Sequence, residues 1–170
     1  MTGAIALLLF VTLQRLAELV HARRNTQRLL AEGAVEIGAE HYPLLVMLHA
    51  TWLAALWVLA ISAHAEIWWP AIALYAATEL ARIWVMASLG RYWTTRILVP
   101  RETPLVRRGP YRFIRHPNYW VVAFEIALLP LALGSLSLAV VFSILNAAVL
   151  ALRIRVEEGA LKPRRGLPIP

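Results

Sequence analysis

Two short segments of this sequence hold residue types that could do chemistry. Residues 108–120 read RGPYRFIRHPNYW, and residues 153–161 read RIRVEEGAL. Proline is favoured at the first position of a helix, so Gly109 and Pro110 predict a turn followed by a short helix. In the second segment, Arg153 and Glu157 are four residues apart and would share one face of a helix. Both segments therefore predict charged groups that are held by helices.

The first of these segments also predicts an anion site. His116 precedes Pro117, and the residue before a proline is pushed toward extended geometry, so a new helix is expected to begin at Pro117. The free N–H groups and the positive dipole end of that helix would then lie beside Arg115 and His116. The alternative is a basic elbow whose arginines contact lipid phosphates at a membrane surface.

The second segment adds two carboxylates, Glu157 and Glu158, directly after an apolar stretch. If the preceding helix continues past the membrane, Glu157 shares a face with Arg153, and Glu158 lies on another face. An anion site and two carboxylates at one membrane surface would fit a ligand that carries both a cation and an anion.

The elements that position these segments are membrane spans. The chain has 170 residues, of which 60% are hydrophobic, and no cysteine, so disulfides and thiolate metal sites are excluded and no metal is expected. A helix needs roughly 20 apolar residues to cross a bilayer. The sequence predicts an all-α, multi-pass transmembrane helical bundle, with one domain over residues 1–161 and a flexible tail over 162–170. The expected spans are residues 3–20, 42–62, 68–89, 119–133 and 136–153.

The basic residues predict how the spans are oriented. Of the 17 lysines and arginines, all but Arg15 and Arg82 lie in residues 21–41, 90–118 and 153–170. The links near His64 and Gly134 hold none. By the positive-inside rule, the N-terminus is expected outside the cell membrane, with the C-terminus and both charged segments in the cytoplasm. The net charge of +7 is therefore explained by topology, and nucleic acid is not expected as a partner.

Several ionisable residues lie inside the expected spans, where a charge costs about 3 kcal/mol on insertion scales. Arg15 with Glu18, and Glu79 with Arg82, are each spaced by three residues and are expected to pair along one helix as packing devices. Glu125 has no such partner. It is either a hydrogen-bonded helix contact or a residue with a role near the site.

Two further polar residues, His49 and Asn146, also fall within expected spans. Polar side chains in membrane helices commonly form hydrogen bonds between helices. We expect that arrangement for both.

Three motifs resemble those of the isoprenylcysteine carboxyl methyltransferase family of small membrane enzymes that use S-adenosylmethionine. They are Leu105-Val106-x-x-Gly109-Pro110-Tyr111-Arg112, Arg115-His116-Pro117-x-Tyr119 and Arg153-Ile154-x-x-Glu157-Glu158-x-x-Leu161. The resemblance covers roughly residues 89–161 and implies that a lipid acceptor enters sideways between helices. The cofactor-binding residues it implies are Leu105, Val106, Gly109, Pro110, Tyr111, Arg115, His116, Pro117, Tyr119, Glu157 and Glu158.

A narrower resemblance concerns residues 89–96, Asn118 and Glu125. These are similar to a bacterial branch of the family that O-methylates alkylpyrones or alkylresorcinols. The expected function is therefore methyl transfer from S-adenosylmethionine to a phenolic or pyrone hydroxyl, or to a carboxylate, of a lipophilic small molecule. The expected catalytic residues are Arg153, Glu157 and Glu125, with membrane lipids as the surrounding partners.

The resemblance also leaves one structural question and three alternative functions. Little chain follows Leu161, so a lid over the cofactor is expected from residues 90–107. The first alternative is methyl esterification of isoprenylcysteine. The second is an NADPH-dependent sterol-type reductase, because such enzymes carry a similar Arg-His-x-Asn-Tyr element, although the Gly-Asp/Glu pair that usually follows it is missing after Tyr119. The third is a membrane scaffold without enzymatic activity.

Overall fold

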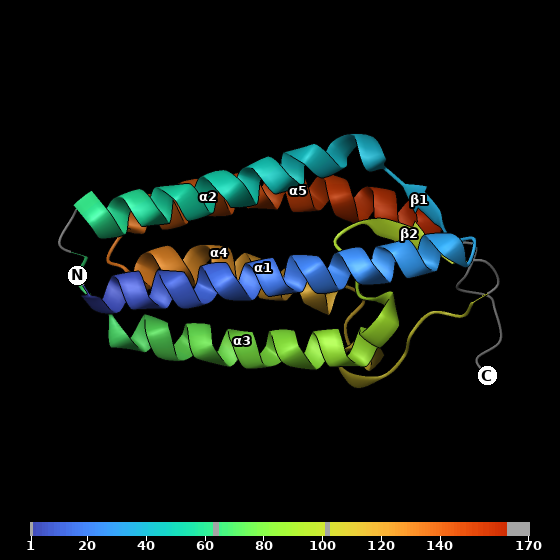
Figure 1. Cartoon of the computed structure of the whole chain (residues 1–170), viewed down its shortest axis with the longest axis horizontal. Helices are drawn as coiled ribbons and strands as arrows, with labels where there is room; N and C mark the ends of the chain where they lie inside the picture. Colours follow the sequence, from blue (N-terminus) through green and yellow to red (C-terminus); the bar gives the residue numbers. More distant parts are fainter. Residues whose placement is uncertain (1, 63–64, 101–102, 163–170) are drawn as a thin grey trace.

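The structure is a computed structural model that describes residues 2–62, 65–100 and 103–162. Five long helices run along its long axis (Figure 1). Among the described residues, four of these helices are long and apolar enough to cross a membrane. The remaining helix, α4 (Pro117–Ala132), has 16 residues and is shorter. The prediction of an all-α, multi-pass helical bundle is confirmed. The helices are α1 (Thr2–Ala31), α2 (Tyr42–Ser62), α3 (Trp69–Leu89), α4 (Pro117–Ala132) and α5 (Leu136–Leu161).

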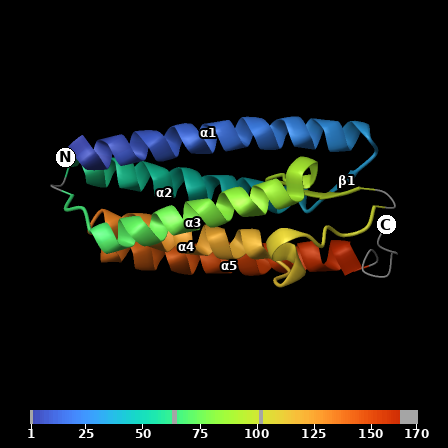
Figure 2. The ribbon, with the colours of Figure 1, turned by 90° about the horizontal axis from the view of Figure 1, so that it is seen from below.

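The connections alternate between the two ends of the bundle. The start of α1 lies at the same end as the α2–α3 and α4–α5 links, whereas the α1–α2 link, the α3–α4 segment and the end of α5 lie at the other (Figures 1 and 2). The arginine-rich links therefore gather at one end, which we call the basic end. Which side of a membrane this end faces stays a prediction.

Helices α2 and α3 cover almost the same residues as the expected spans, but α1 and α5 are longer than expected. Helix α1 continues to Ala31 through the segment that the sequence suggested as a polar link. No helix breaker interrupts it before Gly33, and Ala22, Asn25 and Leu29 are buried on one face. Helix α5 continues to Leu161, so its last turns carry the predicted site residues. The expected flexible tail lies outside the described residues from Pro163 onward.

A small antiparallel sheet, which the all-α prediction did not include, joins two of the links at the basic end. Strand β1 (Val35–Ile37) pairs with β2 (Ile97–Val99), with Glu36 opposite Leu98. Arg96 donates a hydrogen bond to Glu36 at 2.5 Å. Three-residue strands are too short for hydropathy to separate from a loop. The sheet fixes residues 97–99 next to the ends of α1 and α5.

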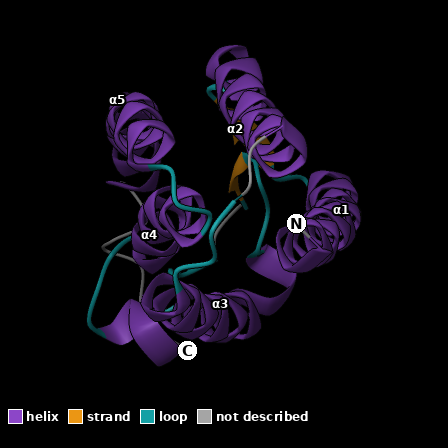
Figure 3. Ribbon diagram, turned by 90° about the vertical axis from the view of Figure 1, so that its left-hand side faces the viewer, coloured by secondary structure: helices purple, strands orange, loops and turns teal. Residues whose placement is uncertain are grey.

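Helix α4 lies between α3 and α5 (Figure 3) and packs against both. It begins at Pro117, where the missing N–H costs no helical hydrogen bond. It ends at a tight turn in which Gly134 has φ 79°, a conformation that favours glycine. Ser135 then caps α5 by accepting a hydrogen bond from Leu138 N at 3.3 Å. The predicted hairpin therefore places the start of α4 and the end of α5 side by side at the basic end.

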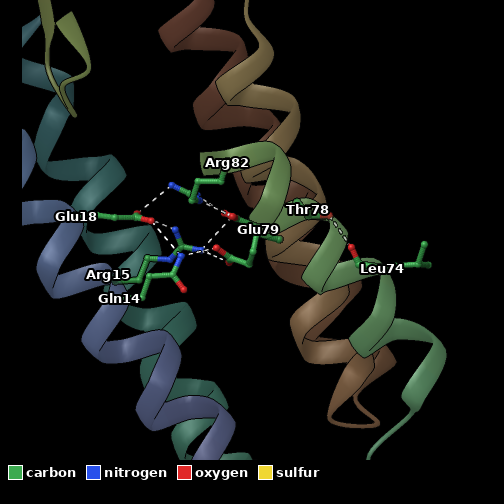
Figure 4. A network of polar contacts seen from close by, with 8 residues as sticks. Gln14, Arg15, Glu18, Leu74, Thr78, Glu79 and Arg82 are labelled. Carbon is green, nitrogen blue, oxygen red and sulfur yellow. Dashed lines mark hydrogen bonds and ion pairs between the residues drawn. The ribbon is translucent and has the colours of Figure 1, made fainter. Parts of the chain in front are cut away.

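A buried polar network joins α1 to its neighbours in the middle of the bundle (Figure 4). Arg15 forms ion pairs with Glu18 at 2.8 Å, Glu79 at 3.0 Å and Glu125 at 3.1 Å. Gln14 donates hydrogen bonds to Glu18 and Glu79. The expected pair within α1, Arg15 with Glu18, is therefore present as one part of a larger cluster.

The expected pair of Glu79 with Arg82 is wrong, whereas Glu125 is a hydrogen-bonded contact between helices, the first of its two expected roles. Arg82 reaches across to Glu18 at 3.0 Å and to Glu125 through both Nε and Nη2, rather than along its own helix to Glu79. The partners of Glu125 come from other helices, since both Arg15 on α1 and Arg82 on α3 pair with it. Pairing across helices draws both guanidinium groups into the bundle, away from lipid, where partial compensation of each charge is possible. We call Gln14, Arg15, Glu18, Glu79, Arg82 and Glu125 the central network.

His49 also differs from expectation. It bonds to Leu45 O of its own helix at 2.9 Å, and no bond to another helix is present in the part of the chain that the structure describes.

Candidate active site

A cavity of about 350 Å³ lies at the basic end, between the start of α4, the end of α5 and the segment around β2. This size falls within the range of small-molecule sites, roughly 300–1,000 Å³. Residues from all three motifs meet in its walls. The predicted site residues that line it are Leu105, Val106, Tyr111, Arg115, His116, Tyr119, Arg153, Glu157 and Glu158.

Tyr119 connects the two helices that form one wall of this cavity. Its hydroxyl, on the first turn of α4, donates a hydrogen bond to the Glu157 carboxylate on α5. Arg153 Nε donates to the same hydroxyl at 2.9 Å. Tyr119 and Arg153 are both buried. Arg153 and Glu157 therefore act from one face of α5, as predicted, and the Tyr119 hydroxyl lies between them.

Arg153 is fixed from a second direction by the segment before β2. Its Nη2 donates to Thr95 O at 2.7 Å. Since β1 holds residues 97–99 in place, the sheet helps to orient this arginine. A guanidinium held by two fixed acceptors still has other N–H donors for an anionic group.

His116 links the two carboxylates. Its Nε2 lies 2.9 Å from Glu158 Oε1, and its Nδ1 lies 3.5 Å from Glu157 Oε2. Its ring stacks on Tyr119, with centroids 5.4 Å apart. Hydrogen bonding to Glu157 and Glu158 raises the pKa of His116 above its ordinary value, against the opposing effect of burial. His116 therefore favours its charged form beside these acids.

Tyr111 contributes a neutral aromatic ring to the same cavity. It follows the start of the short 3-10 helix Gly109–Arg112, as the turn prediction required. Burial, together with the charge of Glu157, raises the pKa of Tyr111, so the phenol stays protonated.

Three predicted binding residues do not line the cavity and instead shape the chain around it. Gly109 has φ 56°, and a Cβ there would lie 2.0 Å from Ser88 Oγ, so this close approach of the loop to α3 requires glycine. Pro110 begins the short 3-10 helix, and Pro117 begins α4; both are buried. Their contribution is to aim Tyr111, His116 and Tyr119.

Glu125 lies apart from this constellation. It belongs to the central network and does not line the cavity. The structure therefore brings Arg153 and Glu157 together but not Glu125, which was expected to act with them.

Two lining residues were missed as binding residues. Trp93 Nε1, a donor, and Asn118 Oδ1, an acceptor, are buried atoms without a hydrogen-bond partner among the described residues. An unpartnered buried polar atom costs about 1–3 kcal/mol. These atoms, together with the Glu157 and Glu158 carboxylates, fit a ligand with hydroxyl, amine and heteroaromatic groups, as S-adenosylmethionine has.

Comparison with known proteins identifies the chain. Residues 71–163, more than half of its length, match the model of the Isoprenylcysteine carboxyl methyltransferase (ICMT) family. This chain belongs to the ICMT family. The match contains both α4 and the described part of α5, and every charged residue of the cavity wall named above.

Two relatives are similar to this ICMT family member over most of its length. An uncharacterized protein of Bacillus subtilis (strain 168), YpbQ, is 40% identical over 159 residues, which cover 92% of this chain and 95% of the relative. An uncharacterized protein of Haemophilus influenzae is 28% identical over 145 residues, 81% of this chain and 83% of the relative. No solved structure matches significantly. The family resemblance is thereby confirmed, and the chain is a membrane methyltransferase; the alkylpyrone branch stays a prediction.

Proposed function

We propose that this protein transfers a methyl group from S-adenosylmethionine to an oxygen of a lipophilic small molecule. The observation that carries this proposal is the cavity at the basic end, in which Arg153, Tyr119 and Glu157 are bonded into one wall and His116 joins both carboxylates. The acceptor oxygen is a phenolic or pyrone hydroxyl, or a carboxylate. Methyl esterification of isoprenylcysteine is the alternative within the same chemistry.

The cavity contains acidic residues, neutral polar groups and groups that suit an anion. Glu157 and Glu158 supply negative charge for the sulfonium and for ribose hydroxyls, and Trp93 and Asn118 supply one donor and one acceptor. Arg115 and the free N–H groups at the start of α4 suit the carboxylate of the cofactor. When bound, S-adenosylmethionine supplies an electrophilic methyl group, and a hydroxyl acceptor gives up its proton as its oxygen is methylated.

Arg153 and Glu157 are the groups of this chain that suit the acceptor. Arg153, oriented by Tyr119 and Thr95, stabilises a developing or existing oxyanion. Glu157 accepts the proton of a phenolic or enolic hydroxyl, whereas a carboxylate acceptor needs no base. Glu125 is not assigned this role, since two arginines hold it in the central network.

The proposed location follows from the arginine-rich links. We infer that the basic end faces the cytoplasm, with the N-terminus outside the cell membrane. Reporter fusions after Glu66 and at Pro170 should read exterior and cytoplasm respectively. A cytoplasmic signal after Glu66 would reverse the orientation without affecting the chemistry.

The test of the function is a titration of the purified protein with S-adenosylmethionine and, in parallel, with NADPH. We expect binding of the first only. His116→Ala and Glu158→Ala should each weaken it by roughly 10-fold or more, as expected when a charged partner is lost, whereas Arg23→Ala, on the exposed part of α1, should not. Equal losses in all three variants would indicate general destabilisation. Binding of NADPH alone would favour a reductase, and binding of neither a scaffold.

The acceptor class is then read from methyl transfer to matched long-chain resorcinol, pyrone and S-farnesylcysteine analogues in detergent. Turnover on a hydroxyl acceptor should rise with pH and fall in Glu157→Gln. Methylation of only the farnesylcysteine analogue would select the isoprenylcysteine alternative.

A further inference from the structure

A second cavity lies between α4 and α5, further along the bundle from the first. Its volume is about 350 Å³, and its surface is mostly apolar. Small side chains on the facing helices, Ala123 on α4 with Ser143 and Ala147 on α5, leave this space. Trp120 and Ala147 are exposed, so the cavity opens as a groove on the outer surface of the bundle. We call it the α4–α5 groove.

The groove and the candidate active site share part of their walls. Arg115, His116 and Tyr119 line both. A molecule lying in the groove would therefore contact residues that also line the active site. An apolar chain in the groove and a polar head at His116 and Tyr119 would make a single continuous ligand.

Asn146 makes the groove more than an apolar gap between helices. It is 2% exposed, it lines the groove, and its Oδ1 has no hydrogen-bond partner among the described residues. The expectation of an interhelical hydrogen bond at this position is therefore wrong for Oδ1. Leaving a buried carbonyl unpaired is costly in an apolar setting, so a donor that enters the groove would be bound selectively.

We propose that the α4–α5 groove is the subsite for the chain of the methyl acceptor, and that Asn146 selects acceptors carrying a hydrogen-bond donor within that chain. This rests on the proposed methyl transfer. Asn146 lies seven residues before Arg153 on α5, about 10 Å along the helix. The preferred acceptor is therefore an amphiphile with its reactive oxygen at one end and a hydroxyl or amide N–H about 10 Å away from it.

The test uses the full chain in lipid nanodiscs, without cofactor. The probe is a diazirine-bearing analogue of octadecanoic acid, whose carboxylate stands in for the reactive end, and labelled peptides are mapped by mass spectrometry. We expect labelling of the α4 and α5 residues that line the groove. Ala147→Phe, which fills the groove, should lower labelling by roughly tenfold, since each buried CH₂ contributes about 0.8 kcal/mol. Ala148→Phe, an exposed neighbour outside the groove, is the matched control.

Selection by Asn146 is measured by competition between octadecanoic acid and 10-hydroxyoctadecanoic acid for the same labelling. The hydroxylated competitor should bind roughly three- to tenfold better to the natural protein, as one added hydrogen bond allows. In Asn146→Leu this preference should disappear. Equal competition in both proteins would overturn the role of Asn146 and assign a water to its amide.

Three results would overturn this inference. Labelling spread over lipid-facing positions and unchanged by Ala147→Phe would indicate surrounding lipid only. Groove labelling in a preparation that binds no S-adenosylmethionine would indicate a lipid site without a methyl acceptor role. Cofactor binding with no groove labelling, in contrast, would refute this inference and leave the proposed function standing.

Discussion

Arginine and glutamate form two clusters in this molecule, and the clusters differ in what surrounds them. In the central network, Arg15 and Arg82 are bonded to three glutamates from α1, α3 and α4. Neither arginine lines either of the two cavities described above. At the basic end, Arg153 and Glu157 are joined through Tyr119 and line one of them.

The difference shows that residue type alone does not separate a structural cluster from a functional one. Both clusters contain buried arginines, and Glu125 is more buried than Glu157. What sets the basic end apart is that its unpaired atoms line a cavity, whereas Gln14 Oε1 in the central network also has no partner among the described residues but lines neither cavity. Trp93 and Asn118 present unpaired atoms beside Arg153 and Glu157. We therefore expect substitutions in the central network to affect stability, and substitutions in the cavity to affect ligand binding.

The largest effect is expected for Arg82→Met. The variant leaves Glu18 and Glu125 with one guanidinium fewer inside the bundle, and breaking a buried pair in this way costs roughly 3–5 kcal/mol. Unfolding of the purified protein in detergent, followed by circular dichroism, should show the loss. Arg91→Ala is the control, since the Arg91–Glu32 pair is about half exposed at 44% and 45% and should contribute less than about 1 kcal/mol. Similar losses in both variants would contradict the structural role of the central network.

The sequence predicted the bundle well because a bilayer restricts the chain so strongly. A span must be long and apolar, and its backbone must satisfy its own hydrogen bonds, so hydropathy alone located α2 and α3. It could not place helices next to one another. The partners of Glu125 could therefore not be named: Arg15 and Arg82 are far away in sequence and become its neighbours only when α1, α3 and α4 pack.

The same limit applies to the site. The motifs identified Arg153, Glu157 and His116, since their spacing is local to a helix or its start. Trp93 and Asn118 were missed as binding residues because a buried atom without a partner is a property of packing. The β1–β2 sheet was missed because three-residue strands have no clear period. These are the features that turn a set of charged residues into a shaped cavity.

Compared with Arg82→Met, Glu157→Gln is expected to affect stability less and ligand binding more. The variant keeps the shape of the side chain but removes the charge that Tyr119 and His116 contact. Loss of a hydrogen bond to a charged group costs about 1.5–3 kcal/mol, so affinity for S-adenosylmethionine should fall roughly 10- to 100-fold.

Isothermal titration in detergent measures this change, and Glu32→Gln, in the exposed pair with Arg91, is the matched control. A Glu157→Gln protein that binds the cofactor normally but melts far earlier would place Glu157 with the central network instead. That outcome would remove the contrast between the two clusters.

The smallest effect is expected from the protonation of His116, and it sharpens the contrast because only the basic end should show it. The carboxylates of Glu157 and Glu158 raise the pKa of His116, with Arg115 nearby as an opposing charge. A pKa raised by folding contributes stability that is fully present below the unfolded value, about 6.5. That stability is lost as the pH rises from there through the folded pKa. Melting temperatures of the natural protein should therefore approach those of His116→Gln as the pH rises above about 6.5.

The control is a protein that carries both Glu157→Gln and Glu158→Gln. In this background, His116→Gln should change the pH dependence of the melting temperature little, because the partners that raise the pKa of His116 are gone. A pH dependence that persists in this background would mean that His116 responds to burial or to other charges, and the two carboxylates would lose their assigned effect on it.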